Sequence, residues 1–121
     1  MSQHNQTIGA LGESLASSYL HDHGYQVIKR HATSHWGEID IIAEKDATLC
    51  FVEVKTKTSD KYGKPYEAVT RGKLIRLKRS IEFYLQTRKS PHTRFQIHVI
   101  SILLKPDLSI LDLKHFTDLG L

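Results

Sequence analysis

The sequence predicts an α/β fold in which helices flank a central mixed β-sheet, with elements in the order α-β-β-β-α-β-β. Two segments repeat apolar residues at helical spacing, and five shorter segments are rich in Ile, Val, Leu and Phe. Turn-forming residues separate most of these segments. A length of 121 residues fits one modest hydrophobic core, so a single domain over residues 1–121 is expected.

Two helices are expected. The first is predicted over residues 7–22, where apolar residues recur at helical spacing: Ile8, Leu11, Leu15 and Tyr19. Gly24 follows as a stop signal, and Gly12 lies within the apolar arc, which suggests close packing on the sheet. The second helix is predicted over residues 66–87, with one apolar face: Leu74, Leu77, Ile81, Tyr84 and Leu85.

Five strands are expected, and turns or loops separate them. Their predicted ranges are 25–30, 37–43, 49–56, 95–104 and 109–113. Asp46 lies midway between the second and third strands as a hairpin turn, and a polar loop covers residues 57–65. Pro106-Asp107 marks the turn before the last strand.

Composition excludes several classes of protein. The lone cysteine, Cys50, forbids an intramolecular disulfide and is typical of a buried small side chain in a reducing cytosol. No apolar run approaches the roughly 20 residues of a membrane span, and residues 1–7 lack the layout of a signal peptide. A cytoplasmic protein without a membrane partner is expected. The net charge of +4 and a pI near 9.2 favour an anionic partner, nucleic acid first.

Charged residues occupy two strands where apolar ones would be expected. Because side chains alternate along a strand, Glu38 and Asp40 share a face, and so do Glu53 and Lys55. A hairpin centred on residues 46–47 places Asp40 opposite Glu53 and Glu38 opposite Lys55, with Cβ atoms about 5 Å apart. Two carboxylates at that separation repel unless a cation or a shared proton lies between them.

These residues fit metal-assisted phosphodiester hydrolysis. A divalent ion such as Mg²⁺, held by Asp40 and Glu53, would polarise a phosphate and acidify a water molecule. Lys55 could orient that water or stabilise the charged phosphate. Glu13 borders the apolar arc of the first helix and could complete the site. The alternative is a solvated strand face with a simple Glu38–Lys55 ion pair, although it explains the opposed Asp40 and Glu53 poorly.

Basic residues beside this site predict contacts with nucleic-acid phosphates. They lie in the polar loop and in the second helix: Lys57, Lys64, Arg71, Lys73 and Arg76. The alternative is that the basic residues of the helix simply form its solvated face.

The spacing of Asp40, Glu53 and Lys55 resembles the PD-(D/E)XK nuclease superfamily, with Ile39 in place of the nominal proline. The chain is more similar still to the YraN-like family of uncharacterised, endonuclease-like proteins, over nearly its whole length. The matching pieces are GxxGE at 9–13, Gly24-Tyr25, GEIDIIA at 37–43, FVEVKT at 51–56, Tyr62-Gly63 with Pro65, Lys73, and Arg94-Phe95.

The resemblance implies a restriction-endonuclease-like core that binds Mg²⁺ or Mn²⁺. It implies Asp40, Glu53 and the backbone carbonyl of Val54 as metal ligands, Lys55 as the catalytic lysine and Glu13 as a further acidic member. Glu38 and Thr56 would contact the metal-binding and catalytic side chains without binding the metal themselves. Archaeal Holliday-junction resolvases look similar in this region, which makes branched DNA a candidate substrate beside duplex DNA.

Two departures from the family pattern concern substrate contacts. Gln96 replaces the usual Asp after Arg-Phe, and residues 31–36 lack the usual Asn and Arg.

The sequence is compatible with three functions. The first is an endonuclease, for which symmetric cutting of both DNA strands would favour a homodimer. The second is a nucleic-acid-binding module that keeps the fold but has lost turnover. The third is a protein-interaction module with a solvated, charged strand face.

Overall fold

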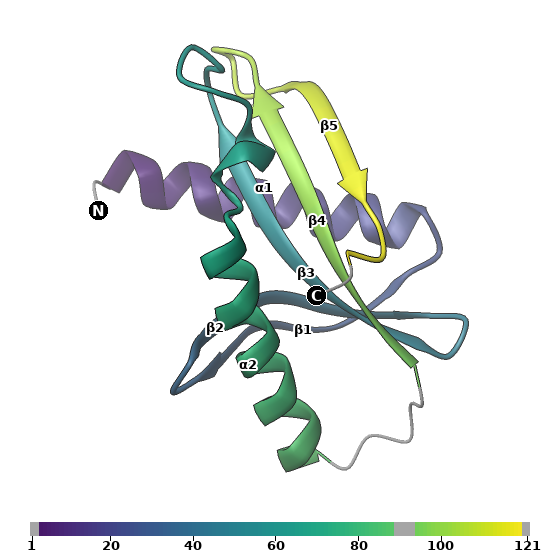
Figure 1. Ribbon diagram of the computed structural model, residues 1–121. Helices are drawn as coiled ribbons and strands as arrows, with labels where there is room; N and C mark the ends of the chain where they lie inside the picture. The colour runs from purple at the N-terminus through teal and green to yellow at the C-terminus, as the bar shows by residue number, and fades with distance from the viewer. Residues whose placement is uncertain (1–2, 89–93, 120–121) are drawn as a thin grey trace.

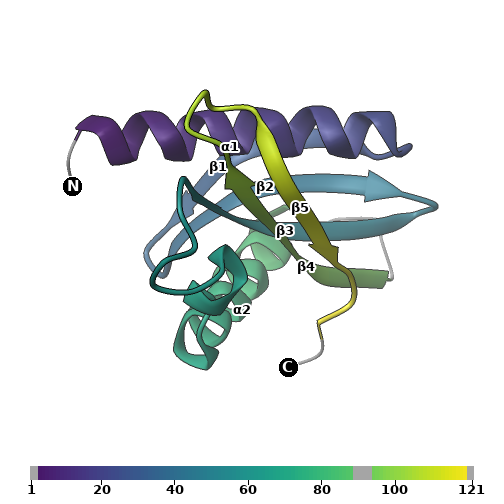
Figure 2. The same ribbon diagram turned by 90° about the horizontal axis from the view of Figure 1, so that it is seen from above.

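A five-stranded β-sheet lies between two long helices in the computed structural model, which describes residues 3–88 and 94–119 (Figure 1). Seen from above, α1 covers one face of the sheet and α2 lies against the other (Figure 2). The elements are α1 (Gln3–Asp22), β1 (Gln26–Ser34), β2 (Gly37–Lys45), β3 (Thr48–Lys57), a short 3-10 helix η1 (Pro65–Ala68), α2 (Arg71–Arg88), β4 (Arg94–Leu104) and β5 (Ile110–Phe116). The predicted fold class and element order are confirmed.

The strands lie side by side in chain order, from β1 to β5. All neighbouring pairs are antiparallel except β3 and β4, which run parallel. A parallel pair needs a long crossover, and here η1 and α2 supply it. The sheet is therefore mixed, as predicted, and β3 lies at its centre with neighbours on both sides.

Alternation along the strands gives each face of the sheet its own apolar core. Toward α1 the buried residues are Ile8, Ala16, Leu20, Ile41, Ala43, Cys50, Val52, Val54, Ile100, Ile102 and Leu104. Toward α2 they are Ala32, Ile39, Ile42, Leu49, Phe51, Leu77, Ile81, Tyr84 and Ile97. Cys50 belongs to the first core and is a free, buried thiol, as its isolation in the sequence predicted.

The hairpin between β2 and β3 has the predicted register. Asp46 and Ala47 both have positive φ, 51° and 60°, which is the conformation of a tight two-residue hairpin turn. Paired residues run from Lys45 opposite Thr48 to Ile41 opposite Val52. The pairing ends there, whereas β2 stays paired with β1 down to Gly37. Because β2 pairs with β3 only from Ile41 onward, the two strands separate at Asp40.

Several predicted boundaries are wrong. The second helix does not begin at residue 66, because residues 65–68 form η1 and Val69 is extended. Its true start has a recognisable signal, since Thr70 Oγ1 accepts a hydrogen bond from the Lys73 N–H at 3.3 Å as an N-cap. The first strand continues four residues beyond its predicted end, to residue 34, and the last strand ends at residue 116 instead of 113.

Candidate active site

Asp40 occupies the point where β2 and β3 separate. Its carboxylate accepts a hydrogen bond from the Val54 N–H at 2.9 Å, which replaces the backbone partner that β2 no longer provides. In an extended strand the N–H and C=O of one residue point to the same side. The Val54 carbonyl therefore faces the same gap as the Asp40 carboxylate, the place expected of a metal-binding oxygen.

Glu13 reaches this region from α1 because the helix lies very close to β3. A Cβ atom added at Gly12 would overlap Thr56 Oγ1, so only glycine permits the contact. The expected close packing of Gly12 is confirmed, and Thr56 is the residue it packs on. The neighbouring Glu13 side chain is only 12% exposed.

Three carboxyl groups converge at the split. Burial, followed by the negative charge of Asp40, raises the pKa of Glu13 to about 7. The same two causes raise the pKa of Glu53 to about 7. Burial also raises the pKa of Asp40, against the opposing effect of the Val54 hydrogen bond. Burial and mutual repulsion thus make negative charge costly here in the absence of a cation.

Two lysines lie near Glu53. Lys55 Nζ is 3.5 Å from Glu53 Oε1, and both side chains are mostly buried. The positive charge of Lys55 is the largest cause of a lowered pKa at Lys73, so the two lysines are electrostatic neighbours. Lys55 and Lys73 therefore place positive charge directly beside the carboxyl cluster.

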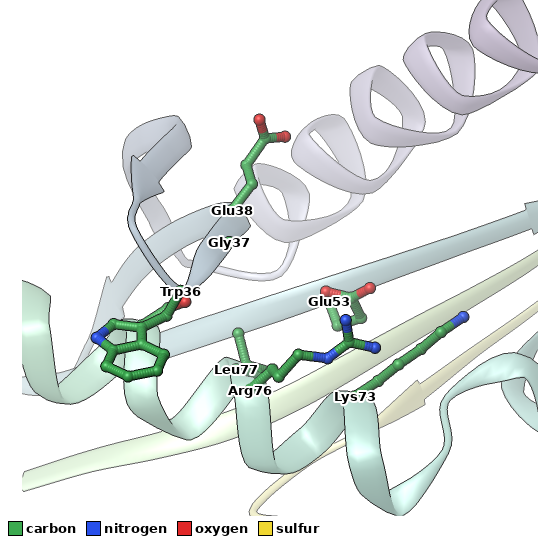
Figure 3. A pocket seen from close by; sticks show the side chains of 8 residues that line it. Trp36, Gly37, Glu38, Glu53, Lys73, Arg76 and Leu77 are labelled. Atoms are coloured by element: carbon green, nitrogen blue, oxygen red, sulfur yellow. The ribbon is translucent and has the colours of Figure 1, made fainter. Parts of the chain in front are cut away.

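A pocket of about 150 Å³ opens between β3 and α2 at Glu53 (Figure 3). Arg76 extends from α2 toward the Glu53 carboxylate, Lys73 extends from α2 on the far side of Arg76 from Trp36, and Trp36 lies at the other end of the pocket (Figure 3). Its lining combines acidic, basic and apolar side chains, including Trp36, Glu38, Glu53, Lys73, Arg76 and Leu77.

A second group of possible metal ligands includes Glu13 and adjoins the carboxyl cluster. Glu13, His31 and Glu38 each offer a ligand atom, and these atoms all lie within 4.8 Å of one another. His31 Nε2 is 2.7 Å from Glu13 Oε2, and its Nδ1 is 2.6 Å from Glu38 Oε1. His31 also has a positive φ of 55°, a conformation that few residues other than glycine adopt. This group could hold a metal ion.

A family model matches residues 12–102, about three quarters of the chain, and carries the description "Uncharacterised protein family UPF0102". The chain belongs to this family, UPF0102. A UPF0102 protein of Chlorobium phaeobacteroides is 39% identical over 98% of this chain and 96% of its own length. One of Syntrophus aciditrophicus is 41% identical over 85% of this chain and 81% of its own length. One of Clostridium perfringens is 36% identical over 98% and 97%. This is the YraN-like group that the sequence motifs indicated.

The matched region of this UPF0102 chain contains every predicted site residue, but the structure does not bring all of them together. Lys57 Nζ donates to the Gly63 carbonyl at 3.4 Å, and Lys64 forms an ion pair with Asp60 at 2.6 Å. Arg71, the first residue of α2, is exposed and does not line the pocket at Glu53. Of the five predicted phosphate contacts, only Lys73 and Arg76 line that pocket.

The prediction that Glu38 stands opposite Lys55 is wrong, and so is the ion pair between them that the alternative interpretation required. Glu38 lies beyond the end of the β2–β3 pairing and stands opposite Thr33 of β1 instead. Its carboxylate contacts His31, whereas the Lys55 ammonium group contacts Glu53. The physical reason is the split of the sheet, which carries Glu38 away from β3 while leaving Glu53 and Lys55 on one strand face.

Sequence reasoning missed His31, Arg30 and Trp36. Arg30 Nη2 is 3.8 Å from Glu13 Oε2 and adds positive charge to that side of the cluster. The first strand was expected to end at residue 30, so the continuation of β1 that carries His31 past Glu38 was not foreseen. The only sign of His31 in the sequence was that it lies within residues 31–36, the segment that departs from the family pattern.

Over the described ranges 3–88 and 94–119, neither helix is long and apolar enough to cross a membrane.

Proposed function

We propose that the protein is a divalent-metal-dependent nuclease that hydrolyses phosphodiester bonds in DNA. The observation that carries the proposal is the convergence of Glu13, Asp40 and Glu53 at the split in the sheet, with Lys55 3.5 Å from Glu53. Buried carboxyl groups with raised pKa values are typical of functional sites, and a divalent cation would relieve their repulsion.

The donor set fits Mg²⁺ or Mn²⁺. Asp40, Glu53 and the Val54 carbonyl offer oxygen atoms, the preferred donors of both ions. The adjoining Glu13, His31 and Glu38 group adds an imidazole, which Mn²⁺ accepts more readily than Mg²⁺ does. When bound, the cation would polarise the phosphate and lower the pKa of a water molecule.

Basic side chains of the protein would bind the DNA and stabilise the reacting phosphate. Lys73 and Arg76 line the pocket that DNA phosphates would enter, and their positive charges would hold the DNA backbone in place. Lys55 is placed to stabilise the extra negative charge that builds up on the phosphate during hydrolysis. A module that only binds DNA would have no need for buried carboxyl groups beside these cations, because they repel phosphate.

The proposal is tested with labelled single-stranded, duplex and four-way-junction DNA in Mn²⁺. Wild type should cleave at least one of these substrates, and EDTA should stop the reaction. Glu53→Gln should abolish cleavage, whereas the matched control Glu82→Gln, on an exposed part of α2, should cleave as wild type does. The proposal fails if wild type cleaves nothing, or if Glu53→Gln is as active as the control.

A further inference from the structure

Trp36 is the only tryptophan of the chain, and it is 41% exposed at the rim of the Glu53 pocket (Figure 3). It lies in the tight turn between β1 and β2, which is held against α2. The Trp36 N–H donates to Ser34 Oγ at 3.1 Å, and Ser34 Oγ lies 3.4 Å from Ser80 Oγ on α2. The backbone that carries the indole is therefore fixed relative to the pocket.

The indole itself is also held in position. The Arg79 guanidinium carbon lies 4.9 Å from the centre of the Trp36 ring, a cation–π distance. The His35 ring meets it edge-on at 5.2 Å. These contacts hold a large aromatic side chain partly exposed at the pocket, although burying it completely would stabilise the fold more.

The remaining wall of the pocket has the charge that a nucleotide requires. Lys73 and Arg76, three residues apart on one face of α2, provide two cations. Leu77, which is almost fully buried, provides the apolar part of the wall. An aromatic platform together with a cationic groove is the combination that binds single-stranded nucleic acid.

We propose that this pocket receives an unpaired nucleotide of DNA, whose base stacks on Trp36 while Lys73 and Arg76 hold its phosphate beside Glu53. The inference rests on the proposed function and narrows its substrate to single-stranded DNA or to the unpaired positions of branched DNA. In the interior of a duplex both faces of each base are covered by its neighbours, so an interior base can stack on the indole only after it leaves the helix. Stacking of one base corresponds to about a 5- to 150-fold gain in affinity.

The test uses the fluorescence of Trp36, which reports on this pocket alone because no other tryptophan is present. The titrations use Glu53→Gln in Mg²⁺, a protein that is expected not to cleave and that has one repelling carboxylate fewer beside the phosphate. They compare oligothymidylate, an abasic oligonucleotide of equal length, and a closed circular duplex without free ends. Dye anisotropy on each DNA measures binding independently. Oligothymidylate should quench Trp36, whereas the abasic strand and the duplex should bind through their phosphates without quenching.

Substitutions give a second measurement. Trp36→Leu should weaken oligothymidylate binding by about 5- to 150-fold and leave abasic binding unchanged, and Trp36→Phe should restore part of the loss. Tyr62→Leu is the matched control, because its ring is 88% exposed but lies outside this pocket. Binding of oligothymidylate without a change in Trp36 fluorescence would overturn the inference, as would no binding at low salt.

Cleavage in Mn²⁺ separates this inference from the proposed function. Cleavage without quenching overturns base stacking and leaves the nuclease standing. Quenching by oligothymidylate without cleavage of any DNA supports the nucleotide pocket and contradicts hydrolysis.

Discussion

Asp40→Asn should make the metal-free protein more stable at pH 8, although it alters a central residue. Asparagine can still accept the Val54 hydrogen bond, so the substitution mainly removes a negative charge from a buried carboxyl cluster. Wild type must ionise Glu53 against a pKa raised from 4.5 to about 7. A difference of that size costs about 3 kcal/mol at pH 8.

Only part of that cost comes from Asp40, because burial is the larger cause at both Glu53 and Glu13. Removing the Asp40 charge should therefore recover about 1 kcal/mol, equivalent to a rise in Tm of about 4 °C. A carboxyl with a raised folded-state pKa stabilises the protein fully below its unfolded value, and this stability is lost as pH rises through the folded value. The gain should accordingly appear as pH rises from about 4.5 to above 7 and be absent at lower pH.

Calorimetric melting at pH 8 and at pH 4 measures this gain, with Asp112→Asn on β5 as the matched control. At Mn²⁺ concentrations ten times Kd, wild type should gain about 1.4 kcal/mol from metal binding, whereas Asp40→Asn should gain almost nothing. An unchanged or lower Tm for metal-free Asp40→Asn at pH 8 would refute the account of a repelling cluster. Equal Mn²⁺ stabilisation of both proteins would refute Asp40 as a ligand.

Three further predictions concern the same site. Mn²⁺ affinity, measured by calorimetry, should rise with pH and level off above pH 7, because the carboxyl groups with raised pKa must lose protons to bind metal; a flat profile would contradict this. Replacing Lys73 and Arg76 by Ala should reduce the salt dependence of DNA affinity by about one unit of slope per lost phosphate contact, whereas Lys78→Ala should not. Gly12→Ala should destabilise the protein by about 1–3 kcal/mol in denaturant melts, and adding Thr56→Ala should recover part of the loss; full stability of Gly12→Ala would contradict the close contact.

The sequence was sufficient to predict the hairpin register but not where its pairing ends. Alternation and the turn at Asp46 determine which residues of β2 and β3 face each other, and both are local properties. The split beyond Ile41 depends on β1 holding the far end of β2 and on the Asp40 side chain replacing a backbone partner. These are tertiary effects, and they explain why Glu38 was assigned the wrong partner.

The remaining parts of the site illustrate the same limit. Gly12 indicated close packing because glycine in an apolar arc has few other uses, whereas its contact with Thr56 required the packed helix. His31 has no sequence pattern of its own, since its position depends on a positive φ and on β1 continuing past its expected end. The start of α2 was predictable from Thr70 as an N-cap, and the apolar periodicity alone placed it too early.

The most direct test of the central claim is single-turnover cleavage of labelled DNA in Mn²⁺ by wild type and Lys55→Ala. Lysine is not a metal ligand, so calorimetry should show nearly unchanged Mn²⁺ binding by the variant. The cleavage rate should fall by about 10²–10³, the effect of removing one preorganised donor to the transition state. Lys55→Arg should restore only part of it, because a planar guanidinium cannot occupy the place of a compact ammonium group. Equal rates for wild type and Lys55→Ala would contradict the assignment of this cluster as the centre of a nuclease.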